Sequence, residues 1–484
     1  MTRKNMVIIM SDEHNKFIQG HMGHDIIKTP NLDKLAARGT KFSNAYTTCP
    51  ICVPARASFA TGRHVNEIGN WDNAFPYTGA VPSWGHYLNQ RGVRCDSVGK
   101  LHFRSDEDNN GFAREVAPLH IVGGVGDLLG LVREELPVRK GARNLALEAG
   151  RGESSYTKYD RQVRNNAIDW LTNEAPKHED GWVVFVSFVA PHFPLIAPDE
   201  FYDLYADLDL PMPKLYNEDE RPDHPYLVEM NKCFPYDEPF NDKEMVQTAM
   251  KAYFGLVSFM DDNVGRVVDA VDALGLGDNT DILYVSDHGD NLGARGLWGK
   301  FVMYEESAGI PLLIAGPDIP AGKTVAEPVS FVDIMPTVME CAGFDAHEID
   351  PTLPGTSLYD QIRGTAPKDR AVLSEYHAAG ACTGNFMVRH GKYKYIDYVG
   401  MPPMLFDLTA DPEELNDLAS DPEYAEVLAA MDAKLQEFCD PEEVNAKALA
   451  AQKELIDQHG GRDAVLNRGD FGYSPTPDQK VEFN

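Results

Sequence analysis

The stretch NMVIIMSD, Asn5–Asp12, decides the fold, because five consecutive apolar residues lead into a serine and an aspartate. Two later stretches repeat this design: GWVVFVSFVA runs towards His192, and DILYVS runs into Asp287 and His288. Short apolar runs between helical segments are typical of strands that are buried on both faces of a mostly parallel α/β sheet. Ligands bind at the carboxyl ends of strands in such sheets, so the polar residues that end these three runs are expected to share one site.

Segments with helical character separate these runs. Residues 31–39, 160–175 and about 242–274 are predicted to be helices, and PLLIAG (Pro311–Gly316) is predicted to be a fourth strand. Residues 104–156 and 198–240 are irregular and rich in proline, asparagine and charge. Long loops of this kind usually cover a site or carry specificity.

The pattern of apolar and polar residues changes after about Arg370. AVLSEY, NFMVRHGKYKYIDY and MLFDL alternate like antiparallel strands, with a turn expected at His390-Gly391-Lys392, and an acidic helical segment follows at 422–439. We therefore predict an α/β fold with a large, mostly parallel central sheet flanked by helices, and a smaller C-terminal α+β subdomain that contains an antiparallel sheet. The predicted domains are residues 1–368, residues 369–440, and a polar C-terminal extension over 441–484.

Composition excludes several classes of function. Lysine and arginine total 44 against 75 aspartates and glutamates, and the resulting net charge of −31 opposes binding to nucleic acid or to an anionic membrane. No stretch approaches the roughly 18 apolar residues of a membrane span, and the five apolar residues near the N-terminus are too few for a signal peptide. The seven cysteines are odd in number and dispersed, unlike a disulfide framework. These features predict a soluble cytoplasmic protein.

The segment CPICVPARASFATGRH, Cys49–His64, admits three interpretations. A redox pair at Cys49 and Cys52 would require the small thioredoxin-like unit that carries such motifs, and the sequence lacks it. A structural zinc site would require a second C-x-x-C or a close histidine pair, which is also absent. The third interpretation uses only Cys52 together with the residues that follow it.

Cys52 to Arg56, followed by Thr61-Gly62-Arg63, resembles the C-x-P-x-R signature of type I sulfatases in the alkaline phosphatase superfamily. In that family a separate maturation enzyme oxidises the cysteine to formylglycine. The resemblance extends in chain order over nearly the full length. The further matching residues are Asp12 after the first strand, Lys100 and His102 in GKLHF, His192 in APHFP, Asp287 and His288 in SDHGDNLG, and Lys300 in WGK.

The resemblance implies a role for each of these residues. The catalytic set would be Cys52, Arg56, Lys100, His102, His192 and Lys300, and the metal ligands would be Asp12, Cys52, Asp287 and His288. A mainly oxygen donor set suits Ca²⁺ or Mg²⁺, and the imidazole makes Mn²⁺ a further candidate; Ca²⁺ is the expected ion. A metal-bound diol made from Cys52 would attack the ester and form a covalent sulfo-enzyme. His102 would act as the base, and His192 and Lys300 would bind the transferring oxygens and stabilise the leaving alkoxide.

Two departures from the common sulfatase pattern point to a branch of the family. Many sulfatases carry two aspartates where this chain has Asp12-Glu13, and an Asp-Asn pair where it has Asp287-His288. The histidine, with DNAF and GKLHF, resembles the branch that contains choline sulfatases and phosphonate monoester hydrolases, in which the residue matching Asn73 contacts the transferring group. Glu13 is either a further metal ligand or a neighbour of the ion.

The expected activity is hydrolysis of aryl or alkyl sulfate monoesters, with some promiscuity. The alternatives are a phosphonate monoester or phosphodiester hydrolase on the same scaffold, a choline sulfatase, and a non-catalytic metal or anion binder in which Cys52 stays a thiol. The expected partners are a small sulfate ester, the maturation enzyme, and further copies of the chain in a dimer or tetramer. The resemblance to this branch implies that the C-terminal extension over 441–484 takes part in the oligomer contacts. Aromatic residues available for an ammonium cage are Trp71, Phe75, Trp84, Phe103 and Tyr156.

Overall fold

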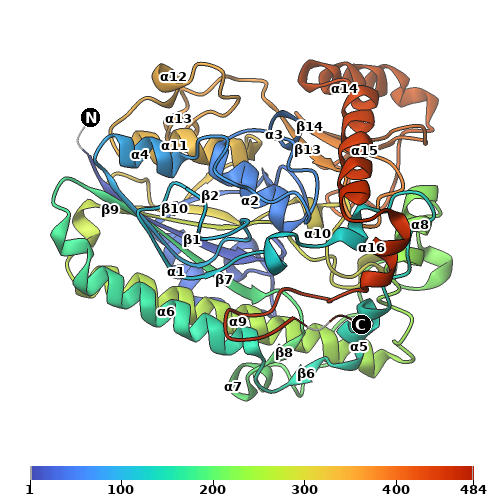
Figure 1. The fold of residues 1–484 in the computed structure, drawn as a ribbon, viewed down its shortest axis with the longest axis horizontal. Coiled ribbons are helices and arrows are strands. Elements are labelled where there is room, and N and C mark those ends of the chain that lie inside the picture. Colours follow the sequence, from blue (N-terminus) through green and yellow to red (C-terminus); the bar gives the residue numbers. More distant parts are fainter. Residues whose placement is uncertain (1–2, 482, 484) are drawn as a thin grey trace.

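The computed structural model describes residues 3–481 and residue 483, and an eight-stranded sheet forms its centre (Figure 1). The strand order is β11-β2-β10-β9-β1-β7-β4-β5. The strands are β1 (Asn5–Asp12), β2 (Gly39–Phe42), β4 (Arg94–Lys100), β5 (Arg114–Leu119), β7 (Trp182–Pro191), β9 (Thr280–Ser286), β10 (Leu312–Ala315) and β11 (Lys323–Val325). Only β10 runs antiparallel to its neighbours, so the predicted mostly parallel sheet is confirmed.

The register of the central strands brings the predicted site residues to one edge of the sheet. In β1, Ser11 pairs with Ser286 of β9, and Asp12 pairs with Pro191 of β7. All three strands are buried along their whole length. The residues that follow them, among them Asp287, therefore meet at the same carboxyl edge.

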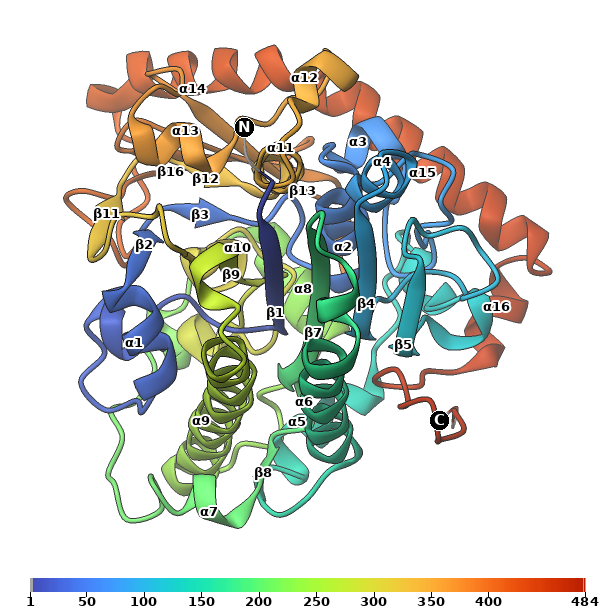
Figure 2. The ribbon, with the colours of Figure 1, turned by 90° about the vertical axis from the view of Figure 1, so that its left-hand side faces the viewer.

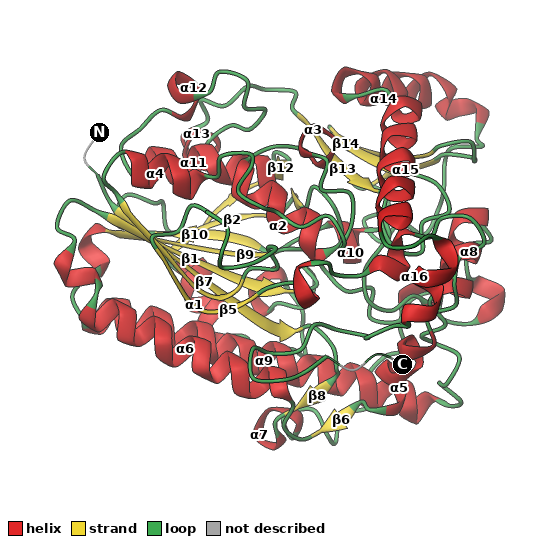
Figure 3. Cartoon of the chain, in the orientation of Figure 1, coloured by secondary structure: helices red, strands yellow, loops and turns green. Residues whose placement is uncertain are grey.

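Helices cover both faces of the sheet, as Figure 3 shows in red. The long helices α6 (Ser155–Asn173) and α9 (Lys243–Ala273) lie on one face, with α1 (Pro30–Ala37) beside α9. The opposite face carries α2 (Cys52–Thr61), α4 (Trp84–Gln90), α11 (Ile334–Cys341) and α13 (Leu358–Arg363). Alternate residues of β1 enter two different cores, Val7 and Ile9 on the α6 side and Met6 and Ile8 on the α2 side. No helix in the described residues is long and apolar enough to cross a membrane.

Shorter elements connect these layers. They are β3 (Ala45–Tyr46), α3 (Val65–Ile68), α5 (Asn144–Leu147), β6 (Gly150–Arg151), β8 (Ile196–Ala197), α7 (Asp199–Tyr202), α8 (Pro225–Cys233), α10 (Glu305–Ala308), β12 (Val329–Ser330) and α12 (Ala346–Ile349). Several of them fall inside residues 104–156 and 198–240, which are predicted to be irregular. Elements this short give no detectable periodicity in the sequence.

The C-terminal part contains the predicted antiparallel sheet, in the order β13-β14-β15-β16. Its elements are β13 (Ala371–Tyr376), β14 (Asn385–His390), β15 (Tyr393–Tyr398), β16 (Met404–Asp407) and α14 (Ala425–Phe438). Gly391 takes the left-handed conformation at the predicted turn, with φ of 55°. The α+β character is thus confirmed, whereas the boundary at residue 369 stays a prediction.

The C-terminal extension departs from the predicted polar tail because it forms two further helices, α15 (Pro441–Gln458) and α16 (Arg462–Arg468). The Asp440 carboxylate accepts hydrogen bonds from two backbone amides of the first turn of α15, and Pro441 occupies its first position. In Figure 2 both helices lie along the outside of the molecule, and the last residues run back towards the lower end of the central sheet. The predicted role of this extension in oligomer contacts stays a prediction.

Candidate active site

Cys52 begins α2 and faces the carboxyl edge of the sheet, with a side chain that is 1% exposed. Four charged or titratable groups surround its sulfur. The Sγ atom lies 3.3 Å from Nε2 of His288, 3.4 Å from Nζ of Lys300, 3.7 Å from Oδ1 of Asp12 and 4.0 Å from Nζ of Lys100. Residues that are far apart in the sequence thus converge on this one atom.

Arg56, one helical turn after Cys52, fixes the carboxylates of the cluster. Its Nε donates to Oδ2 of Asp287 over 2.8 Å, and its Nη2 donates to Oδ2 of Asp12 over 3.0 Å. Its Nη1 donates to Oγ of Ser187 and to the carbonyl of Lys100. All three guanidinium nitrogens are engaged, and such charge-assisted bonds hold the two carboxylates in place.

The arrangement fits a divalent cation. Ligand atoms of Asp12, Cys52, Asp287 and His288 all lie within 4.8 Å of one another, and all four residues are buried. Burial opposes ionisation of Asp12, but the charge of Lys100 and neighbouring cationic groups outweighs it and holds the pKa of this carboxyl well below its usual value. Two carboxylates and one imidazole are donors that Ca²⁺, Mg²⁺ and Mn²⁺ accept.

Glu13 belongs to the same cluster, but its carboxylate faces Lys300 and His192. Its Oε2 lies 3.1 Å from Nζ of Lys300 and 3.4 Å from Nε2 of His192, and together with Asp12 and His192 it forms a second group of potential ligand atoms. Burial raises the pKa of Glu13 to about 8. Its Oε1 has no hydrogen-bond partner among the described residues. The geometry therefore keeps both interpretations of Glu13 open.

His102 and His192 line the same cavity as Cys52. Within the described part of the chain, neither ring nitrogen of His102 has a hydrogen-bond partner. His192 donates from Nδ1 to the carbonyl of Phe193 over 2.6 Å, which leaves Nε2 without a proton when the ring is neutral. Burial, followed by the charges of Lys100 for His102 and of Lys300 for His192, holds both imidazole pKa values well below the usual value. Both rings are therefore neutral and available as proton acceptors.

Asn73 and Lys300 complete the residues that the sequence singles out. Oδ1 of Asn73 accepts a hydrogen bond from the backbone amide of Val53 over 3.2 Å, so the carboxamide is held beside the first turn of α2. Burial opposes the charge of Lys300, but Cys52, Glu13 and other acidic groups raise its pKa above the ordinary value. Lys300 therefore carries a positive charge next to the sulfur.

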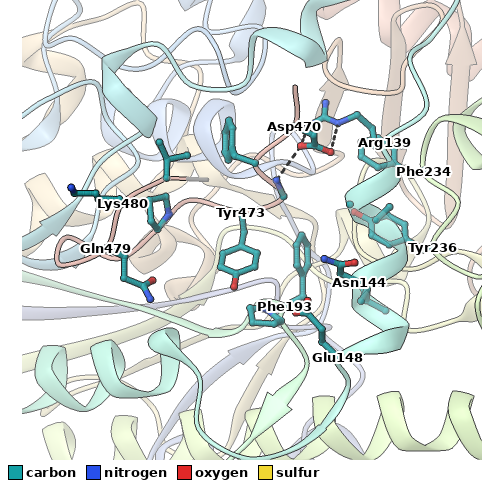
Figure 4. A pocket seen from close by; sticks show the side chains of 18 residues that line it. Arg139, Asn144, Glu148, Phe193, Phe234, Tyr236, Asp470, Tyr473, Gln479 and Lys480 are labelled. Carbon is teal, nitrogen blue, oxygen red and sulfur yellow. Dashed lines mark hydrogen bonds and ion pairs between the residues drawn. The ribbon is translucent and has the colours of Figure 1, made fainter. Parts of the chain in front are cut away.

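These side chains open onto a small cavity of about 70 Å³. Cys52, Asn73, His102, His192 and Lys300 line it on the side of the sheet. A larger chamber of about 410 Å³ adjoins it, and Figure 4 shows the residues of that chamber. The residues that line both spaces are Arg139, Phe193, Phe234, Tyr236, Phe471, Gly472 and Tyr473. A ligand of the inner cavity would thus have its outer part among aromatic side chains.

Most of this aromatic wall escapes prediction from the sequence. Of the five aromatic residues expected near the site, Tyr156 lines the inner cavity. Trp84, in α4, and Phe103, in the loop after β4, instead pack in the core on the α2 side. Trp71 packs against His377. The sequence gives an indication only for those wall residues that belong to the irregular segments 104–156 and 198–240, because long loops of this kind often cover sites.

An α/β sheet that gathers a buried cluster of cations, carboxylates and histidines around one cysteine has the composition of a hydrolase active site. A family model described as Sulfatase matches residues 4–344, and one described as N-sulphoglucosamine sulphohydrolase, C-terminal, matches residues 293–440. The chain belongs to the sulfatase family and is a sulfuric ester hydrolase.

Individual relatives agree with this assignment. The choline-sulfatase of Rhizobium meliloti is 34% identical over 421 residues, which cover 85% of this chain and 81% of that protein. Arylsulfatase K of Homo sapiens is 28% identical over 472 residues, 93% of this chain and 85% of that protein. The solved phosphonate monoester hydrolase of Agrobacterium radiobacter shares the fold with a TM-score of 0.71 at 22% identity, over 90% of this chain and 95% of that one.

Proposed function

We propose that Cys52 is matured to formylglycine and that the protein hydrolyses sulfate monoesters of aryl or alkyl alcohols. The convergence of Asp12, His288, Lys100 and Lys300 on the Cys52 sulfur is the observation that carries this proposal. Burial and the charge of Asp12 raise the pKa of the Cys52 thiol to about 12, so the unmodified side chain would be a weak nucleophile at neutral pH.

The residues around Cys52 would have different roles. Asp12, Asp287 and His288 would hold a divalent cation, with Ca²⁺ as the expected ion and Mg²⁺ or Mn²⁺ as alternatives. That ion, together with the hydrated aldehyde, supplies a hydroxyl that is nucleophilic at neutral pH. The neutral ring of His102 takes a proton from the hydrated residue 52 when sulfate is released.

The other side of the cavity would bind the group that is transferred. Lys300 donates to the sulfate oxygens and stabilises the negative charge that develops on the leaving oxygen, and Asn73 binds the same group from the start of α2. His192 holds a proton at Nδ1 against the carbonyl of Phe193, so its Nε2 is positioned to receive a hydrogen bond or a proton. The backbone of the first turn of α2 favours an anion at this point.

Charge supports a singly charged ester as the substrate. Three buried cations, Arg56, Lys100 and Lys300, face two buried carboxylates in the cluster, Asp12 and Asp287, and Glu13, whose pKa of about 8 leaves it mostly protonated at neutral pH. This set is net positive and becomes more so when a divalent ion is added, which suits a sulfate monoester anion. The similarity to the choline-sulfatase and the shared fold with the phosphonate monoester hydrolase make choline sulfate and phosphonate esters the competing substrates.

Mass spectrometry and kinetics test the proposal together. In protein produced with a maturation enzyme, we expect the peptide that contains Cys52 to lose the mass of a thiol-to-aldehyde conversion, while Cys49 stays unchanged. We expect kcat/KM for an aryl sulfate to exceed that for the matching aryl phosphonate. An unmodified Cys52 in an active protein would refute the nucleophile, and a preference for phosphonate by orders of magnitude would refute the substrate class.

We also propose that the protein works in the cytoplasm as a homo-oligomer. The seven cysteines, all within the described residues, are unpaired, which supports a reducing compartment. The oligomer is proposed from the resemblance to the choline sulfatase branch, and light scattering of the purified protein would detect a dimer or tetramer. A monomeric scattering mass across the working concentration range would refute it.

A further inference from the structure

The segment Asp470–Val481 folds back onto the catalytic domain and forms part of the active-site wall. Phe471, Gly472 and Tyr473 line both the inner cavity and the outer chamber, and Ser474 lines the inner cavity alone. Figure 4 shows Tyr473 among the other wall residues, with Asp470 against Arg139. The sequence places this segment in the polar C-terminal extension and gives no indication that it reaches the site.

An ion pair holds the beginning of this segment. Arg139 donates from Nε to Oδ2 of Asp470 over 3.1 Å and from Nη2 to Oδ1 over 3.0 Å. The remaining nitrogen, Nη1, lies 3.0 Å from Oδ2 of Asp127. Arg139 is 6% and Asp470 is 8% exposed. A bidentate, largely desolvated pair of this kind is geometrically specific, so it fixes where the segment meets the domain.

A hydrogen bond holds the segment on the other side of Tyr473. The hydroxyl of Tyr156 donates to the carbonyl of Ser474 over 2.6 Å. Within the first turn of the segment, the backbone amide of Gly472 donates to Oδ1 of Asp470 over 3.0 Å. Because the chain is anchored both before and after Tyr473, the position of this ring is set by the structure around it.

The ring of Tyr473 stands between the reacting groups and the outer chamber. Its centroid lies 5.2 Å from that of Tyr156 and 6.4 Å from that of Phe193, edge to face in both cases. Phe193 in turn contacts the ring of His192 at 4.2 Å and lies 5.5 Å from Nζ of Lys300. An ester whose sulfate lies beside Lys300 would therefore extend its alcohol part between these rings.

The chemistry of this wall favours one class of alcohol. Phe193, Phe234, Tyr236, Phe471 and Tyr473 offer aromatic faces and edges, which pack well against a planar ring. The guanidinium of Arg139 is already paired with two carboxylates, so it adds no free cation for a second anionic group on the substrate. A chamber of about 410 Å³ accommodates a small molecule rather than a length of polymer.

We propose that Tyr473 is a specificity-determining residue, that Arg139 and Asp470 position it, and that this wall selects small sulfate monoesters with a planar leaving group. The proposal rests on the proposed sulfatase activity, and it assigns the leaving-group side of the same site. The wall contributes binding of the alcohol part and does not take part in bond breaking, so changes in it act on KM more than on kcat.

Kinetics with two small esters test this role. We compare Tyr473→Ala and Asp470→Asn with wild type on 4-nitrophenyl sulfate, which is planar, and on propyl sulfate, which is not. We expect each variant to raise KM for 4-nitrophenyl sulfate about tenfold while KM for propyl sulfate changes less than about twofold. Tyr473→Phe, which keeps the ring, is expected to restore the low KM for 4-nitrophenyl sulfate that Tyr473→Ala loses. Asp463→Asn, which removes an exposed carboxylate in α16, is the matched control for Asp470→Asn and is expected to behave like wild type.

A binding measurement separates this proposal from the proposed function. We titrate Cys52→Ala protein, with and without Tyr473→Ala, with 4-nitrophenyl sulfate by calorimetry. If wild type hydrolyses no sulfate ester but Tyr473→Ala still weakens binding about tenfold, the proposed sulfatase activity is refuted. The proposed role of the wall in binding a planar group is then retained. If wild type is active and Tyr473→Ala changes neither binding nor KM, the wall proposal fails. Equal loss of affinity for propyl sulfate would also overturn it, because the effect would then not depend on a planar group.

Discussion

Two of the clusters of buried charge in the described residues can be compared directly, and only one of these two has the properties of an active site. The first surrounds Cys52. The second, which we call the seam cluster, joins the central part of the molecule to the C-terminal sheet. Its members are Lys16, Lys214, Arg295, Glu305, Glu306, Lys394 and Glu414. Both clusters shift pKa values strongly, so neither burial nor a perturbed pKa distinguishes them.

The difference lies in what the charges face. In the seam cluster, Nζ of Lys394 lies 3.0 Å from Oε1 of Glu305 and 2.8 Å from Oε1 of Glu414, and Glu305 is also paired with Lys16. Charges there face each other across two parts of the fold. Around Cys52, by contrast, the nitrogens of His102 are unpaired within the described residues and line a cavity. Unused hydrogen-bonding capacity next to a cavity therefore identifies the site better than charge does.

The largest effect should come from removing the nucleophile. Cys52→Ala is expected to lower sulfate release by on the order of 10⁴-fold or more, because the proposed mechanism forms the nucleophile from Cys52. The unfolding free energy should change by about 1 kcal/mol, since few atoms are lost from a buried position. Sulfate release and thermal unfolding, measured on the same preparation, check both parts. Residual activity within tenfold of wild type would contradict the assignment.

Breaking the seam cluster should give the opposite pattern. Lys394→Met leaves Glu414 buried without its cation, which typically costs about 3–5 kcal/mol of unfolding free energy. The kcat of the protein that stays folded should match wild type. Denaturant unfolding and active-site-normalised kinetics measure the two effects.

A neighbouring lysine provides the control for this experiment. Lys392 pairs with Asp407; the lysine side chain is 51% exposed, and the buried carboxylate also accepts hydrogen bonds from two backbone amides. Lys392→Met should cost less than about 1 kcal/mol, because exposed ion pairs contribute little. Equal costs for the two lysine variants would show that burial of the seam cluster does not determine its contribution.

Metal binding should also distinguish the two clusters, with a smaller effect on the unfolding free energy. Chelation is expected to abolish activity and to lower stability, because an ion at 100 times its Kd stabilises the folded state by about 2.7 kcal/mol. Lys394→Met should gain the same increment as wild type when Ca²⁺, Mg²⁺ or Mn²⁺ is restored, since the proposed ligands Asp12, Asp287 and His288 lie outside the seam cluster. Thermal unfolding with and without chelator tests this. A variant Asp287→Asn that responds to metal as strongly as wild type would contradict the proposed ligand set.

Sequence reasoning succeeds where chemistry and periodicity coincide. The apolar runs of β1, β7 and β9 predict buried strands, and the polar residues that follow them predict a shared site because strand ends align. By contrast, β4, with the sequence RCDSVGK, contains too few consecutive apolar residues to be recognised as a strand. It is a strand because β7 and β5 pair with it on both sides.

The wall of the site shows a second limit. Nothing in the sequence near Arg139 or Asp470 indicates that the two pair, because they lie 331 positions apart in irregular segments. Helices α15 and α16 are also absent from the prediction, because their apolar stripe is narrow and their caps stand out only once the segment is considered helical. Contacts between distant loops depend on the whole fold, so a single sequence does not reveal them.

The smallest predicted effect concerns Asp72, a buried acid that belongs to neither cluster. It is buried beside Asn73 of the site but faces α15, where Nε2 of Gln452 donates to its Oδ2 over 2.7 Å and the amide of Ala74 donates to Oδ1. Within the described residues it forms no ion pair. Burial raises the pKa of Asp72 to about 7, against an ordinary value of 3.8.

The sign of the resulting pH dependence follows from this shift. Between about pH 4 and pH 7 the folded state holds a proton on Asp72 that the unfolded state has released, so this group stabilises the protein fully at low pH and its contribution is lost as pH rises to about 7. Between pH 5 and pH 6 the loss amounts to at most about 1.4 kcal/mol. Asp72→Asn should remove this part of the slope, as urea unfolding at the two pH values would show. An unchanged slope in the variant would mean that Asp72 is ionised in the folded protein, and that a buried carboxylate here is held by amide donors alone.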